Sequence, residues 1–300
     1  MDPTPHSHRE RSRSIFVMLA AVALFALMDA GLKTLSERYP PFQVAALRGM
    51  ASLPLVLAWS LATIGLRPLL RVRWPLHALR GAIGIAMMAS FVYALKRMPL
   101  STAYTIFFVA PLLITALSVP FLGERVGPRR WTAIGIGLLG VLVVLRPSGQ
   151  GMLSLAGLAV LLAAFGYAVS AITVRVLARS DSNQAMVVWL LALMALGSGL
   201  LAWPGWRPIH AGDWWLIAAI GVVGSLGQYT ITYAFRHGEA SLLAPLEYTA
   251  LVWGVSLDAL VWGALPDSVT WLGAGIIIAS GLYLIRRDRA RPPMEPIAPP

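Results

Sequence analysis

Four ionisable side chains stand inside long apolar stretches of the sequence: Asp29, Arg48, Arg80 and Glu247. The segment "APLEYTALVW" around Glu247 is typical, because it holds one carboxylate among apolar, aromatic and small residues. A charge in such surroundings is costly, and it is kept where it faces an opposite charge, a ligand or water. These four residues could therefore form ion pairs or bind a polar ligand, and a carboxylate could also exchange a proton.

The surrounding composition indicates a lipid environment. The chain is 58% hydrophobic and 12% charged, whereas soluble domains carry roughly a quarter charged residues. Apolar runs of bilayer length recur without strand-like alternation, which favours helices over a barrel. We predict an all-α integral membrane protein with ten transmembrane helices, at residues 15–34, 42–65, 74–96, 100–121, 130–146, 152–177, 183–205, 212–236, 240–263 and 269–286.

The net charge of +11 is distributed unevenly between the two predicted membrane faces. With the N-terminus inside, 16 Lys and Arg residues fall on the cytoplasmic face and 6 on the outer face. This asymmetry follows the positive-inside rule and places both termini in the cytoplasm. It accounts for the basic charge without a nucleic-acid partner.

Several chemistries lack the residues that they need. The chain has no cysteine, which excludes disulfides and thiolate nucleophiles. Its five histidines lie in tails or near helix ends, so we expect no metal site and no cofactor. "GIGLLG", from Gly135 to Gly140, matches a dinucleotide fingerprint but lies inside a predicted span, where small residues favour close helix packing.

The sequence also contains an internal repeat. A shift of 140 residues aligns "YALKRMPLS" from Tyr93 with "YAFRHGEAS" from Tyr233, and gives 11 identities over the 54 positions from residue 93 to 146. Each copy holds five predicted helices, an odd number, so the second copy crosses the membrane in the opposite sense. Inverted repeats of this kind are typical of secondary transporters.

The stretch "YALKRMPLSTAYTIFFVAPLLITALSVPFLGERVGPRRWTAIGIGLLGVLVV" resembles the EamA module of the drug/metabolite transporter superfamily, and "APLEYTALVWG" with "WLGAGIIIASGLYL" resembles a second copy. The second copy departs from the pattern, because Gly263 is followed by Ala264 where the first has Glu124. We therefore divide the chain into a cytoplasmic tail at 1–14, repeats at 15–146 and 152–286, and a Pro-rich tail at 287–300, expected to be disordered and cytoplasmic.

This resemblance implies a carrier of small metabolites in the cytoplasmic (inner) membrane of a bacterium, commonly an exporter. It also implies a central cavity lined by the first, third, fourth, sixth, eighth and ninth helices. The mid-span polar and aromatic residues on these helices, together with Asp29, Arg80 and Glu247, form the expected substrate site: Tyr104, Thr105, Tyr167, Ser170, Gln228, Tyr229 and Tyr248.

The depth of the interior charges suggests two pairs. Arg80 and Glu247 both lie about 10 Å from the cytoplasmic face, and Asp29 and Arg48 lie at similar depths near the outer face. The pairs could be static links between helices, or groups that bind substrate and separate during transport. Protons, exchanged at Glu247, would be a possible coupling ion.

Two further acids are expected to have local roles. Asp258, within two turns of the outer end of its span, should reach water, and Glu124 should cap a helix or pair with a nearby arginine.

Three classes of function remain open at this point. The expectation is a secondary carrier, not an enzyme, that moves a small polar or amphipathic metabolite, best an amino acid or related compound. The alternatives are an integral membrane enzyme acting on a lipid-linked substrate and a non-transporting sensor or scaffold. The substrate, its direction, the coupling ion and the oligomeric state are not set by the sequence.

Overall fold

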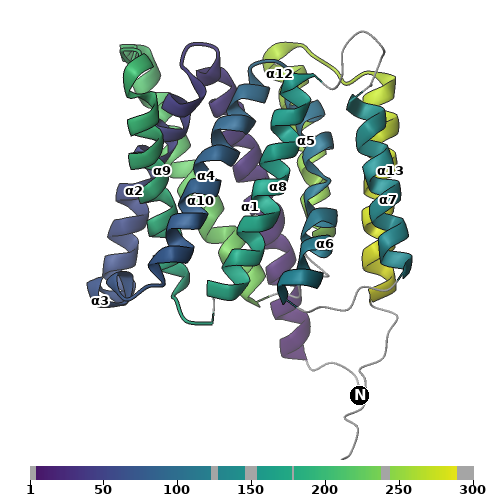
Figure 1. Cartoon of the computed structure of the whole chain (residues 1–300), viewed down its shortest axis with the longest axis horizontal. Helices are drawn as coiled ribbons and strands as arrows, with labels where there is room; N and C mark the ends of the chain where they lie inside the picture. The colour runs from purple at the N-terminus through teal and green to yellow at the C-terminus, as the bar shows by residue number, and fades with distance from the viewer. Residues whose placement is uncertain (1–4, 123–127, 146–153, 178, 238–243, 289–300) are drawn as a thin grey trace, which may run out of the picture.

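Every element of the computed structural model is a helix across the residues that it describes, 5–122, 128–145, 154–177, 179–237 and 244–288 (Figure 1). Three short 3-10 helices accompany the α-helices: η1 Trp203–Gly205, η2 Ala211–Asp213 and η3 Ala244–Thr249. The α-helices are α1 Pro5–Ser36, α2 Pro41–Ile64, α3 Leu66–Leu70, α4 Trp74–Leu95, α5 Leu100–Phe107, α6 Ala110–Leu122, α7 Pro128–Leu145, α8 Leu155–Leu177, α9 Asn183–Ala202, α10 Trp214–His237, α12 Ala250–Trp262 and α13 Ser268–Asp288.

The molecule is a multi-pass membrane protein. Seven segments among the described residues are long and apolar enough to cross a bilayer, the fourth being α5 and α6 together. The other expected spans correspond to α7, to η3 with α12, and to α13. Large apolar side chains cover the outside of the bundle, such as Leu200 at 75% and Leu260 at 84% exposed. Such a surface suits lipid tails.

The helix bounds differ from the expected ones mainly at the ends of the chain. α1 begins at Pro5, ten residues before the expected span, so part of the predicted N-terminal tail is helical. α13 continues to Asp288, into the predicted C-terminal tail. Glu124 and residues 289–300 lie outside the described residues, and their expected roles are not addressed by the structure.

Two spans are interrupted within the membrane. α5 ends at Phe107 and α6 begins at Ala110, one residue before Pro111. Proline has no N–H to donate to the carbonyl four residues earlier, and the turn tightens locally, with Val109 N donating to Ile106 O at 3.2 Å. In the other span, Pro245 lies in the 3-10 segment η3, which precedes α12. Backbone of this kind is tolerated in a membrane only where protein or an internal hollow surrounds it.

The helices stand side by side in one bundle (Figure 1), with one large core of buried apolar residues and a small second cluster of Met18, Val22 and Ala234. The most extensive contacts join α2 with α9, α1 with α10, α7 with α13, and α4 with α8, while α5 packs on α12. The side of the bundle on which α1 begins is called the N-side below. The opposite side, which carries the turn between α1 and α2, is called the far side.

Small residues allow some of these helices to approach closely. A Cβ atom added at Gly221 of α10 would lie 2.6 Å from the backbone oxygen of Ala51 in α2. A Cβ atom at Gly49 would likewise lie 2.8 Å from Ala195 N in α9. Gly135, the first glycine of "GIGLLG", has nothing within 4 Å of the corresponding position. A Cβ atom at Gly140, the last glycine of the motif, would lie 2.8 Å from Ile277 Cγ1 in α13, so the expected close packing is confirmed for Gly140 and not for Gly135.

Candidate functional site

Asp29 and Tyr104 meet at the centre of the bundle. Tyr104 of α5 donates its hydroxyl to Asp29 Oδ2 of α1 at 2.9 Å, and both side chains are buried. The tyrosine ring stacks on Phe91 of α4, with centroids 6.5 Å apart, and its other neighbour is Gly254 of α12. Four helices thus position this acid.

A row of aromatic rings leads from this acid toward Glu247. Phe91 contacts Phe107 with centroids 5.7 Å apart, and Phe107 contacts Tyr167 of α8 at 5.5 Å. Glu247, in η3, lies within electrostatic range of Tyr167 and Tyr248. Two carboxylates from opposite ends of the sequence are therefore connected by a row of aromatic rings that pack on one another.

Neither ion pair expected from depth is formed among the described residues. Arg80 donates to Met186 O at 2.7 Å and to Ser170 Oγ at 3.3 Å, so it joins α4 to α9 and α8 without touching Glu247. Arg48 Nη1 lies 3.7 Å from Met88 Sδ and makes no ion pair with Asp29. Equal depth places two residues at one level but does not turn their helices toward each other.

Of the remaining residues of the expected substrate site, four are partly or fully buried and one is exposed. Ser170, Gln228 and Tyr248 are partly or fully buried on helices of the central region. Thr105 is buried but donates to Ser101 O of its own helix at 2.9 Å. Tyr229 is 48% exposed and packs edge-on against Trp59 of α2, away from the aromatic row.

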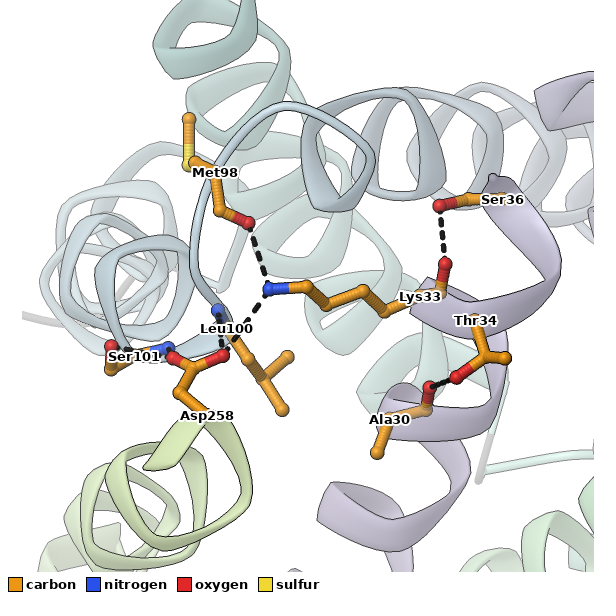
Figure 2. A network of polar contacts seen from close by, with 8 residues as sticks. All are labelled: Ala30, Lys33, Thr34, Ser36, Met98, Leu100, Ser101 and Asp258. Atoms are coloured by element: carbon orange, nitrogen blue, oxygen red, sulfur yellow. Dashed lines mark hydrogen bonds and ion pairs between the residues drawn. The ribbon is translucent and has the colours of Figure 1, made fainter. Parts of the chain in front are cut away.

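Asp258 corrects an expectation. The carboxylate was expected to reach water, but its residue is 0% exposed and accepts hydrogen bonds from four groups (Figure 2). Leu100 N and Ser101 N donate at 2.9 and 2.7 Å, and Ser101 Oγ at 2.7 Å. Lys33 Nζ is the fourth, at 3.2 Å. Asp258 of α12 therefore caps the N-terminus of α5, which has no capping side chain of its own.

Lys33 extends this group of contacts on the far side. Its ammonium also donates to Met98 O at 3.2 Å (Figure 2). The same ammonium lies 4.4 Å from the ring centroid of Trp262. The sequence held a signal for this arrangement, since Lys33 and Asp258 were both near the outer ends of spans and of opposite charge. The ion pair could be predicted only with the knowledge that α1 and α12 are neighbours.

A second far-side contact group joins the turn between α1 and α2 to the loop before α10. Tyr39 donates its hydroxyl to Asp213 Oδ2 at 2.6 Å, and Arg38 forms an ion pair with the same carboxylate. Gln43 and Arg207 exchange hydrogen bonds of 2.7 and 2.9 Å. The far side is thus tied together by polar contacts between the two halves of the chain.

On the N-side, His77 of α4 meets Asp181 in the turn before α9. His77 Nε2 lies 2.8 Å from Asp181 Oδ2, and both side chains are almost fully buried. Arg73 N and Ser180 Oγ also donate to Asp181. Burial alone would raise the pKa of Asp181, but the hydrogen bonds from Ser180, His77 and Arg73 outweigh it and lower the pKa below the ordinary value.

Two pockets open at the surface beside α8 toward the far side, the first against the end of α4 and α5 and the second against α2 and α4. The first, about 440 Å³, includes Tyr93, Arg97, Thr102 and Ser154 in its lining. The second, about 360 Å³, is lined mainly by apolar residues such as Phe42, Leu158 and Leu162. Neither is lined by a residue of the expected substrate site, so the row from Asp29 to Glu247 is separate from both.

Comparison with known proteins gives a family match. The model of the EamA-like transporter family matches this chain twice, at residues 12–146 and 154–286. One crystal structure superposes with a TM-score of 0.64 at 25% sequence identity, covering 92% of this chain and 99% of the other.

Curated relatives match along nearly the same length. A riboflavin transporter of Vibrio cholerae is 31% identical, covering 90% of this chain and 88% of the relative. A pseudopaline exporter of Pseudomonas aeruginosa is 28% identical, covering 91% and 96%. An S-adenosylmethionine uptake transporter of Rickettsia conorii is 29% identical, covering 86% and 87%.

Proposed function

The chain belongs to the EamA-like transporter family, and from this premise we propose that it is a secondary carrier that moves a small polar or amphipathic metabolite by alternating access. The observation that supports this most is the interior row of polar and aromatic side chains described above. The first half of the chain contributes Asp29 and Tyr104 to this row, and the second half contributes Tyr167 and Glu247. A route for a polar compound needs such groups away from lipid.

The two halves are proposed to be inverted repeats of five transmembrane helices each, ten in all. Helix bounds support this at the spacing of the sequence repeat: α4 begins at Trp74 and α10 at Trp214, while α6 ends at Leu122 and α12 at Trp262. The contacts support it as well. In the repeat, α8 is the counterpart of α1 and α10 is the counterpart of α4. The contact of α1 with α10 therefore corresponds to the contact of α8 with α4, and both contacts are extensive.

The polar contacts support a conformation closed on the far side. Asp258 and Lys33 are buried there, as is Asp29 below them. Glu247, nearer the N-side, retains partial exposure. We take the N-side as cytoplasmic and the membrane as the bacterial inner membrane, in line with the excess of Lys and Arg at that side.

The proposed cargo is an amino acid or a related compound, carried without chemical change, and export is favoured. The relatives include an exporter and an uptake transporter, so their names support transport more than direction. Protons are the proposed coupling ion because Glu247 is a carboxylate along the route.

Counterflow in proteoliposomes tests the proposal. Purified protein would be reconstituted in vesicles preloaded with one unlabelled compound from a panel of amino acids and other metabolites, and uptake of the labelled compound would be followed. We expect saturable exchange of at least one compound. No exchange across the panel, together with turnover of an added lipid-linked substrate, would instead support a membrane enzyme.

A further inference from the structure

Arg48 is a charge within the span of α2 that does not form the ion pair expected with Asp29. It lies in α2, and its neighbours are Met88 on α4 and Asp29 on α1. Because these neighbours belong to two other helices, the guanidinium points into the bundle and not toward lipid. Its position is therefore at the Asp29 end of the aromatic row.

The guanidinium has almost no hydrogen-bond acceptors. Its one described contact is from Nη1 to Met88 Sδ at 3.7 Å, and a thioether is a weak acceptor. Nε is buried and has no partner. A guanidinium stays charged in proteins and presents five N–H donors in a planar fork. Leaving Nε of such a group buried and unpaired is costly, so a ligand that supplies oxygen atoms would be favoured.

Asp29 stands close by but does not supply them. Its Oδ2 accepts the hydroxyl of Tyr104, and it forms no ion pair with Arg48 although the two charges interact. A positive and a negative group are thus held near each other without contact. A ligand with both an anionic and a cationic group would satisfy both side chains, whereas an uncharged ligand would satisfy neither.

We propose that Arg48 is the anion-binding residue of the substrate site and takes the carboxylate of a zwitterion whose ammonium group faces Asp29. A carboxylate matches the guanidinium fork in two parallel hydrogen bonds. Phe91 and Tyr104, whose nearly parallel rings lie beside Asp29, would pack against the side chain of the substrate. This inference rests on the proposed function and narrows its substrate class to compounds of the α-amino acid type.

Competition in the counterflow assay tests this assignment. For the amino acid that exchanges best, the free acid would be compared with its amide, which lacks the carboxylate, and with the corresponding acid that lacks the amine. In the wild type we expect the free acid to compete on the order of 10-fold or more better than the amide. Arg48→Gln should bring that ratio close to one, and Arg48→Lys should keep only part of it.

Two variants separate a specific effect from general damage. Arg97→Gln removes an exposed arginine that stacks on Tyr93, and it should leave the acid-to-amide ratio unchanged. Asp29→Asn should keep the acid-to-amide ratio, but the amino acid should no longer compete better than the acid that lacks the amine. Should Arg48→Gln fail to fold, the ratio in Arg48→Lys decides the matter.

The outcomes distinguish this inference from the proposal on which it rests. An unchanged acid-to-amide ratio in Arg48→Gln, or in a folded Arg48→Lys if Arg48→Gln does not fold, would overturn the role of Arg48. Exchange by the wild type of uncharged compounds alone would overturn the zwitterion class while leaving the carrier in place. Failure of the wild type to exchange any compound would remove both.

Discussion

Lys33 and Asp258 lie 225 residues apart in sequence, and their charged atoms are 3.2 Å apart in the structure. The lysine is in α1 and the aspartate in α12, while the same carboxylate holds the first two N–H groups of α5 (Figure 2). One fully buried acid therefore links three helices at the far side. Removing it changes an ion pair and a helix cap together.

Asp258→Asn should destabilise the protein strongly. The amide keeps the volume but leaves the Lys33 ammonium buried without its counter-charge, a loss of about 3 to 5 kcal/mol. Thermal unfolding in detergent would show this as a large fall in midpoint. Ser256→Ala, on an exposed face of the same helix, is the matched control and should leave the midpoint nearly unchanged. A midpoint for Asp258→Asn equal to that of the control would mean that the pair contributes little.

Gly221→Ala should also reduce stability, because the added methyl group would lie 2.6 Å from the Ala51 carbonyl oxygen and push α10 from α2. Overpacking of this kind costs about 1 to 3 kcal/mol. Gly135→Ala adds the same group in open space and should be neutral or slightly stabilising. Thermal unfolding of the two variants side by side measures the difference. Equal midpoints would show that the contact relaxes without cost.

Asp181 should make stability depend on acidity. Its folded pKa is lowered, so its stabilising contribution is present above the ordinary aspartate range and is lost as the pH falls through the folded pKa. Asp181→Asn should lower the midpoint near pH 7 and flatten its fall toward pH 4. Asp267→Asn, which alters an exposed cap of α13, should leave the shape of the profile intact. A wild-type slope in Asp181→Asn would assign the acid sensitivity to another group.

Glu247→Gln should impair exchange while leaving the fold intact, since the amide keeps the shape and removes the charge beside Tyr167 and Tyr248. If protons couple to transport, the variant should also lose any dependence of exchange on pH between 5.5 and 8. Counterflow at several pH values, with unfolding curves alongside, measures both effects. Exchange like that of the wild type throughout this range would remove Glu247 from the mechanism.

Hydropathy predicted the positions of most spans because the bilayer imposes one length and one polarity on each helix. The span expected at 74–96 is observed as Trp74–Leu95, and the one expected at 269–286 as Ser268–Asp288. The start of α1 was missed because residues 5–14 are polar and helical at once, a combination that a search for apolar runs does not detect.

Contacts between helices were less predictable than their positions. Depth follows from counting residues along a helix, but which way a side chain faces depends on how the helix is rotated against its neighbours. Arg80 illustrates the limit, since the residue count predicted the same depth for it as for Glu247, yet its side chain turns to Met186 and Ser170. The burial of Asp258 was not predicted for the same reason, because the sequence does not show which helices surround α12.

The interleaving of the two halves has a consequence for how the protein is made. The most extensive helix contacts described, α2 with α9, α1 with α10, α7 with α13 and α4 with α8, all run between the halves. A ribosome that has released only the first half of the chain has therefore produced helices whose main partners do not yet exist. Each half matches the family model alone, but because its helices pack mainly on the other half, we expect assembly to follow the entry of the second half into the membrane.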